Sequence, residues 1–143
     1  MIIRDISVDV DLSQDMPEVP ANQNWLEQVF LNLITNARDA MEIKHGEKGK
    51  EQVLTVRGRR SENDEVMVEI SDTGEGIPAE IADKIFDPFF TTKEAGNGTG
   101  LGLSISQSII REHGGDITFE TREGEGSTFK VILPPAGQNK TVS

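Results

Sequence analysis

The chain has 143 residues, a formal net charge of −11 at pH 7 and no cysteine. This length suits one domain with a real hydrophobic core. The negative charge argues against a nucleic-acid partner, because non-specific affinity for nucleic acid comes mainly from lysine and arginine. The absence of cysteine excludes a disulfide scaffold and a thiolate metal site.

The first half of the chain predicts a strand, a long helix and two further strands. Apolar residues alternate with polar ones as far as Leu12, which predicts a strand over Ile2–Leu12. Apolar residues then recur at helical spacing over Trp25–Met41, and Asn22 or Asn24 can cap that helix. Alternation predicts the next two strands, over Val53–Gly58 and Val66–Ser71.

The second half predicts two helices followed by a hairpin. A short helix is expected near Pro78–Ile85, and a longer one from Leu101 or Gly102 to about His113, before two glycines. The hairpin strands are expected at Asp116–Thr121 and Ser127–Leu133. This order predicts an α/β (α+β) sandwich, with a mixed, mostly antiparallel sheet and helices on one face. We expect one domain over residues 1–136 and a loose tail over 137–143.

Three polar residues follow one face of the long predicted helix. Gln28, Asn32 and Asn36 are spaced four residues apart, beside the apolar stripe. Asparagine is a mediocre helix former, and its side-chain oxygen is a suitable ligand for a hard cation such as Mg²⁺. The sequence therefore predicts either a cation site on this face or an ordinary solvated helix edge.

A glycine-rich segment, Asp72–Gly76, follows the third predicted strand. Its glycines permit a sharp turn and the close approach of a flat ring. A carboxylate at the strand end can accept hydrogen bonds from an exocyclic amine such as adenine N6. The alternative is a tight turn with an exposed Asp72.

A second glycine-rich segment, Gly96–Gly102, leads directly into a helix, and Lys93 lies just upstream. Backbone N–H groups and the helix N-terminus favour phosphate binding here. The spacing is neither that of a Walker A loop nor that of a Rossmann fingerprint, and the alternative is a loop without ligand.

Phe86–Phe90 is expected to pack in the core or in a lid, with a mobile flap as the functional variant. His45 and His113 are expected to be solvated or capping residues.

These segments together, in this order, resemble the four boxes of the sensor histidine kinases. Asn32–Ala37 resembles the N box, Asp72–Gly76 the first glycine box, Phe86–Phe90 the F box and Gly98–Ile105 the second glycine box. The resemblance spans roughly Leu26 to Gly115, and the flanking strands fit the rest of the chain. It implies the Bergerat ATP-binding fold of the GHKL superfamily.

The resemblance also implies site residues for Mg²⁺ and ATP. By analogy, Asn32 and Asn36 would hold Mg²⁺ and phosphate, and Asp72 would bind the adenine amine. Gly74 and Gly76 would make room for the base, with Ile77 against it. Thr128 would contact adenine through water. The phosphates would be held under a lid by Lys93 and the backbone of Gly98, Thr99, Gly100, Leu101 and Gly102.

One position departs from the family pattern. Many histidine kinases carry lysine or arginine three residues after the second asparagine, where this chain has Asp39. The neighbouring Arg38 lies about 100° further round the helix. Whether Arg38 takes the place of that basic residue stays open at this point.

The amide at Asn32 distinguishes between relatives of the same fold. Gyrase-type ATPases, chaperones and anti-sigma serine kinases usually carry glutamate there, which can serve as a general base. An amide cannot take that proton, so Asn32 favours transfer of the γ-phosphoryl group to a histidine, which is already a competent nucleophile. Alternatives are a nucleotide-sensing or scaffolding domain without transfer activity, and a GHKL-type protein serine kinase or ATPase.

The chain contains no segment that resembles a phosphoacceptor helix, and no apolar run approaches the ~20 residues of a membrane span. We therefore expect the catalytic half of a protein histidine kinase in two-component signalling. Its expected partners are a dimerisation/phosphoacceptor domain and, downstream, a response regulator. The expected location is cytoplasmic, whether or not the parent protein is anchored in a membrane.

Overall fold

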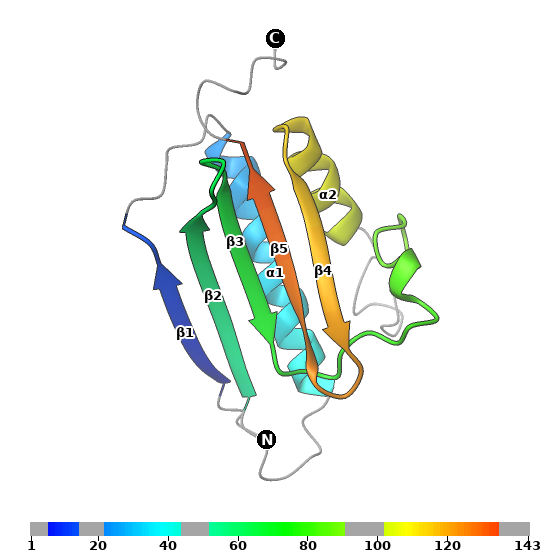
Figure 1. The fold of residues 1–143 in the computed structure, drawn as a ribbon. Coiled ribbons are helices and arrows are strands. Elements are labelled where there is room, and N and C mark those ends of the chain that lie inside the picture. The colour runs from blue at the N-terminus through cyan, green and yellow to red at the C-terminus, as the bar shows by residue number, and fades with distance from the viewer. Residues whose placement is uncertain (1–5, 15–21, 44–51, 91–101, 135–143) are drawn as a thin grey trace.

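The computed structural model describes residues 6–14, 22–43, 52–90 and 102–134, which form one sheet covered by two helices (Figure 1). The sheet has five strands in the order β1-β2-β3-β5-β4. Strand β1 pairs in parallel with β2, and every other neighbouring pair is antiparallel. The elements are β1 (Ile6–Leu12), α1 (Gln23–Ile43), β2 (Gln52–Arg60), β3 (Val66–Asp72), α2 (Gly102–Glu112), β4 (Asp116–Arg122) and β5 (Gly126–Leu133).

Helices α1 and α2 lie on the same face of the sheet, so the predicted sandwich is confirmed (Figure 1). The core lies between this helix layer and the sheet. Helix α1 contributes a buried stripe at helical spacing, made of Val29, Leu33, Ala37 and Met41. Alternate residues of the strands meet this stripe, since successive side chains in a strand point to opposite faces. Among them, Ile70 and Val131 are almost completely buried.

The strands and the two long helices match the predicted ranges within two residues wherever the chain is described. The short helix predicted near Pro78–Ile85 is present as a 3₁₀ helix, which is confined to Ala82–Lys84. Bonds such as Ile81 N to Pro78 O and Lys84 N to Ile81 O span three residues, as in successive turns. The start of the first predicted strand and the tail over 137–143 lie outside the described residues.

Three phenylalanines join the segment after β3 to the sheet. The Phe86 ring meets those of Phe119 and Phe129 edge-on, with centroids 5.9 and 6.4 Å away, while Phe119 stacks on Phe129. Phe90 is also half-buried against the core. The expected core packing of this segment is therefore confirmed for Phe86 and Phe90. Phe89 is 72% exposed and has a φ of 68°.

His113 links the end of α2 to the start of α1. Its Nδ1 lies 2.7 Å from the carbonyl oxygen of Ile109, which can only accept, so Nδ1 carries the proton. Its Nε2 is then free to accept a bond of 3.1 Å from the backbone N–H of Asn22. Asn22 in turn caps α1, because its Oδ1 accepts from Trp25 N at 3.1 Å. His113 is thus a buried capping residue, which is one of the two roles expected for it.

None of the helices in the described part of the chain combines the length and the apolarity needed to cross a bilayer.

Candidate nucleotide-binding site

The loop after β3 is held from three sides. Asp72 is 9% exposed, and its Oδ1 accepts a bond of 2.8 Å from Gly74 N. Thr73 Oγ1 accepts a hydrogen bond of 3.0 Å from Val53 N, near the start of β2. On the hairpin side, Ile77 N donates to Thr121 Oγ1 at 2.8 Å. The carboxylate predicted to bind adenine therefore lies on a backbone that these bonds fix, and Ile77, at the end of the same loop, is half-buried.

Two glycines of this loop are required by the packing of the protein itself. A Cβ on Gly74 would come within 2.7 Å of the Ala40 carbonyl carbon in α1, closer than real side chains approach. Gly76 has a φ of 74° and lies against the backbone of Arg122 in the hairpin. The loop thus bridges α1 and the β4–β5 turn. The predicted approach of a base at these glycines stays a prediction.

The hairpin places Ser127 on the same side of the sheet as Asp72. Ser127 is the register partner of Asp72 and is 7% exposed, with its Oγ 2.9 Å from Thr121 Oγ1. Thr128 is the next residue and bonds Ser71 Oγ at 2.8 Å, and its predicted contact with adenine through water stays a prediction. Alternation from the buried Phe129 already indicates that Ser127 shares the core side.

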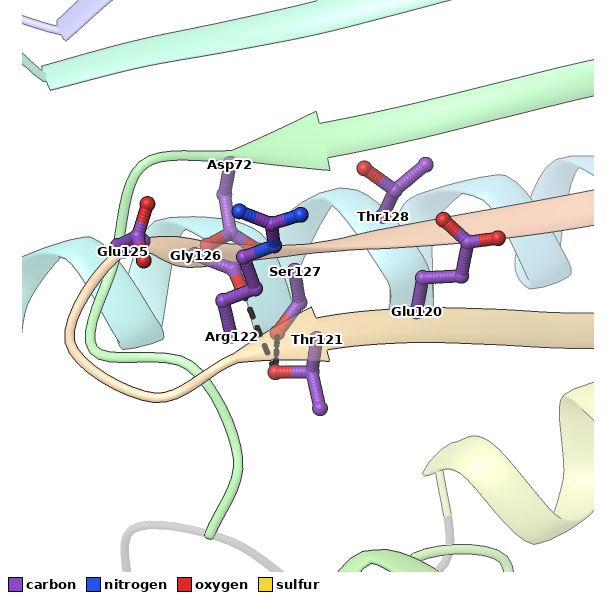
Figure 2. A pocket seen from close by; sticks show the side chains of 8 residues that line it. All are labelled: Asp72, Glu120, Thr121, Arg122, Glu125, Gly126, Ser127 and Thr128. Carbon is purple, nitrogen blue, oxygen red and sulfur yellow. Dashed lines mark hydrogen bonds between the residues drawn. The ribbon is translucent and has the colours of Figure 1, made fainter. Parts of the chain in front are cut away.

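A cavity of about 420 Å³ opens where the ends of β3, β5 and β4 meet (Figure 2). Its lining residues are Asp72, Glu120, Thr121, Arg122, Glu125, Gly126, Ser127 and Thr128. Figure 2 shows the bonds from Thr121 to Ser127 and Gly126, with α1 behind the strands. This volume is in the range of small-molecule sites. In the described part of the chain, the α1 amides do not line it.

The polar line of α1 meets the first turn of α2. Asn32 is half-buried, and its Nδ2 lies 3.3 Å from Gly102 O and 3.2 Å from Ser106 Oγ. Asn36 is also half-buried but makes no hydrogen bond to any described residue. Gln28 is exposed. The structure therefore places Asn32 against the start of the helix that follows the second glycine-rich segment, with Asn36 one turn further along α1.

Arg38 does not extend this line. Its guanidinium lies 3.6 Å from the Asp39 carboxylate, and its side chain is 57% exposed. The arginine is thus paired with the residue that replaces the family's basic side chain.

Among the predicted phosphate-binding residues, Lys93, Gly98, Thr99, Gly100 and Leu101 lie outside the described residues, and Gly102 is the first residue of α2.

The described residues suit a cation that is bound partly by the protein and partly by a phosphate group. No cluster of three or more acidic or histidine side chains occurs among them, so none offers a complete protein ligand set. The amide oxygens of Asn32 and Asn36 are hard ligands on one helix face. Mg²⁺ commonly takes one or two protein oxygens and completes its octahedron with water and phosphate.

Comparison with known proteins places this arrangement in a family. Residues 21–137 match the family model of the histidine kinase-, DNA gyrase B- and HSP90-like ATPases. The chain is 43% identical over 148 aligned residues to the sensor kinase CckA of Brucella abortus (strain 2308), covering 94% of this chain and 15% of that protein. It is 39% identical to the sensor histidine kinase ZraS of Escherichia coli (strain K12), covering 92% of this chain and 26% of that protein. The chain thus spans about a quarter or less of these relatives.

Solved structures agree with the sequence comparison. A nucleotide-free form of the catalytic domain of histidine kinase ThkA superposes with a TM-score of 0.76 at 34% identity, covering 94% of this chain and 82% of that one. Full-length ShkA in complex with AMPPNP superposes with a TM-score of 0.75 at 25% identity, covering 90% and 25%. The chain therefore belongs to the family of histidine kinase-, DNA gyrase B- and HSP90-like ATPases, as a catalytic domain of the sensor histidine kinase type.

Proposed function

We propose that this domain binds Mg-ATP and donates its γ-phosphoryl group to a histidine on a separate dimerisation/phosphoacceptor domain. The observation that carries the proposal is the pair of half-buried amides, Asn32 and Asn36, on the helix against which the Asp72 loop packs. Amide oxygens suit Mg²⁺, and a buried carboxylate suits the adenine amine. Helix α1 would therefore carry the cation-binding amides and support the loop that carries Asp72.

In this proposal, Asp72 and Ser127 face the base, and Ile77 packs against it. Asn32 and Asn36 would hold the cation and the phosphates. Mg²⁺ would neutralise phosphate charge and orient the γ-phosphoryl group. Lys93 and the backbone of Gly98, Thr99, Gly100, Leu101 and Gly102 would complete phosphate binding. Basic and amide groups are needed here because the chain's net charge of −11 opposes an anionic ligand.

Transfer to histidine is favoured over hydrolysis or transfer to serine. Water and hydroxyl nucleophiles need a general base, which is a carboxylate in many relatives of this fold. Asn32 cannot accept that proton, and its Nδ2 is already donated to α2. An imidazole needs no such base. The isolated domain should therefore bind ATP and hydrolyse it slowly.

The relatives' names support the wider setting. They are sensor kinases much longer than this chain, so a phosphoacceptor domain in the parent protein is part of the proposal. A downstream response regulator and a cytoplasmic location complete it.

The first test is calorimetric titration with ADP and ATP, with and without Mg²⁺. Micromolar binding that weakens without Mg²⁺ is expected, and Asp72→Asn should reduce the affinity at least about tenfold, since a hydrogen bond to a charged group contributes about 1.5–3 kcal/mol. Glu75→Gln is the matched control, because it makes the same chemical change in the same loop. Absence of binding by the folded wild type would contradict the proposal and favour a scaffolding domain.

The second test measures phosphotransfer. The domain is mixed with radiolabelled ATP and a separate histidine-bearing dimerisation domain, with that domain's histidine-to-alanine variant as control. Acid-labile label on the histidine is expected. Acid-stable label on serine, or rapid hydrolysis by the isolated domain, would instead indicate one of the other activities of this fold.

A further inference from the structure

We propose that Ser106 is a positioning residue, which holds the Asn32 amide so that its oxygen, and not its nitrogen, faces the magnesium and phosphate side. This inference rests on the proposed function, since it concerns how Asn32 is presented to Mg²⁺. Ser106 lies just outside the residues that resemble the family's boxes, so the resemblance implies no role for its buried hydroxyl.

The Asn32 amide has one possible orientation against α2. Its terminal group lies 3.3 Å from Gly102 O, and a carbonyl oxygen can only accept. The atom facing α2 must therefore be Nδ2, because Oδ1 in that place would leave two acceptors in contact. Ser106 Oγ, 3.2 Å from the same Nδ2, is the second acceptor.

Ser106 is fully buried, at 0% exposure, in the first two turns of α2. Within the described structure its hydroxyl has one side-chain contact, the bond from Asn32. Gly102 O determines which atom of the amide faces α2, and Ser106 adds the second bond that holds the amide in this orientation. A solvent-facing serine would bond to water instead. Burial removes water as a competitor, so the hydroxyl acts on Asn32 alone.

The oxygen of the amide is consequently directed away from α2. Oδ1 and Nδ2 project from the same carbon at about 120° to each other, so fixing one directs the other. Among the described residues, no donor occupies Oδ1. Asn36 follows one turn later on the same polar line. A flipped amide would present N–H donors to a cation, which repels them, so the orientation decides whether Asn32 can be a ligand at all.

The test compares the gain in AMPPNP affinity on adding Mg²⁺ in four proteins: wild type, Ser106→Ala, Asn32→Ala and the double variant. Ser106→Ala should reduce this gain about fivefold, the equivalent of one neutral hydrogen bond. In the Asn32→Ala background the same change should have less than about a twofold effect, because no amide remains to be oriented. An equal effect in both backgrounds, or none in the wild-type background, would overturn the proposal.

Ser108→Ala is the matched control, since Ser108 is an exposed serine on the same helix. Alanine suits a helix interior, so both single variants should fold. A second measurement needs no nucleotide. Hydrogen exchange of the Asn32 side-chain NH₂, followed by NMR in the ligand-free protein, should be about fivefold faster in Ser106→Ala and unchanged in Ser108→Ala.

The two measurements separate the two hypotheses. If the wild type binds no Mg-nucleotide, the proposed function fails and the exchange rates still decide the orientation. Unchanged exchange in Ser106→Ala shows that the hydroxyl does not hold the amide, and the positioning role is then wrong.

Discussion

Helices α1 and α2 run side by side and are joined by polar contacts at both ends, but the two ends differ in how completely those contacts are satisfied. At one end, both ring nitrogens of His113 are bonded, to Ile109 O and to Asn22 N. At the other end, Asn32 donates to Gly102 and Ser106, while its oxygen and the whole Asn36 amide bond no described residue. Both ends use buried or half-buried polar groups, which are costly unless paired.

This difference separates a contact that serves stability from one that, under the proposed function, serves binding. Where every polar atom has a protein partner, the contact holds the helices together. At the other end, the Asn32 oxygen and the Asn36 amide have no partner among the described residues, and these atoms suit a ligand. If the proposed function holds, the helix pair keeps its geometry at the His113 end while the Asn32 end meets the nucleotide.

The largest expected effect is that of His113→Ala on stability. The variant loses two hydrogen bonds and the edge contact with Trp25, so the free energy of unfolding should fall by about 2–3 kcal/mol in urea titrations. The Mg-ATP affinity of the folded protein should change less than about twofold. Glu112→Ala, an exposed neighbour, is the control. A large loss of affinity with little loss of stability would reverse the assignment of the two ends.

Asn36→Ala should act in the opposite way. The Mg²⁺-dependent part of ATP affinity should fall about tenfold, as for loss of a bond to a charged group. Stability should stay the same or rise by about 0.5 kcal/mol, since alanine is the better helix former and no protein bond is lost. Gln28→Ala, on the same polar line, is the control in calorimetry and thermal unfolding. A destabilised Asn36→Ala with normal affinity would mean that this amide is structural.

Asn22→Ala should lower the free energy of unfolding by about 1 kcal/mol, because it removes the side-chain cap on Trp25 N. The bond from the Asn22 backbone to His113 is kept. Asn22→Asp retains a capping oxygen and should stay within about 0.5 kcal/mol of the wild type. Equal losses in the two variants, measured by urea unfolding, would indicate that the cap is not what stabilises this end.

The smallest effect is expected from Trp25, the chain's single tryptophan, which meets the His113 ring edge-on at 6.3 Å. Since this end of the helix pair is satisfied within the protein, saturating Mg-ATP should leave the Trp25 emission spectrum almost unchanged. In His113→Ala the spectrum should change even without ligand. A marked spectral shift of the wild type on nucleotide binding would show that the two ends are not independent.

Much of the fold could be predicted from local pattern. Alternation and helical spacing located every described strand and both long helices, because half-buried strands and amphipathic helices have different periods. The position of β5 between β3 and β4 could not be read locally, since pairing depends on contacts between distant residues. The short helix near Pro78–Ile85 was predicted, but not its 3₁₀ form or its restriction to Ala82–Lys84, because so short a segment takes its conformation from packing.

The residue types of the site were predictable, but several of their contacts were not. Asp72 and the two asparagines lie at a strand end and on a helix face, as their spacing indicates. The sheet register places Ser127 opposite Asp72, a position that the resemblance to the family's boxes did not single out. Ser106 looks like an ordinary helix residue until α1 and α2 are seen packed together. The need for glycine at Gly74 likewise comes from a neighbouring helix backbone.

The pairing of Asp72 with Ser127 has a consequence for folding. These two residues are far apart in the chain, and they become neighbours only when the C-terminal hairpin docks on β3. The side of the site proposed to bind the base therefore forms only after a long loop closes, which is entropically costly and typically slow. A ligand that binds only the closed sheet adds its binding free energy to that step. Nucleotide binding should thus stabilise the paired strands and protect the backbone amides of β3 and β5 from hydrogen exchange more than those of the edge strand β1.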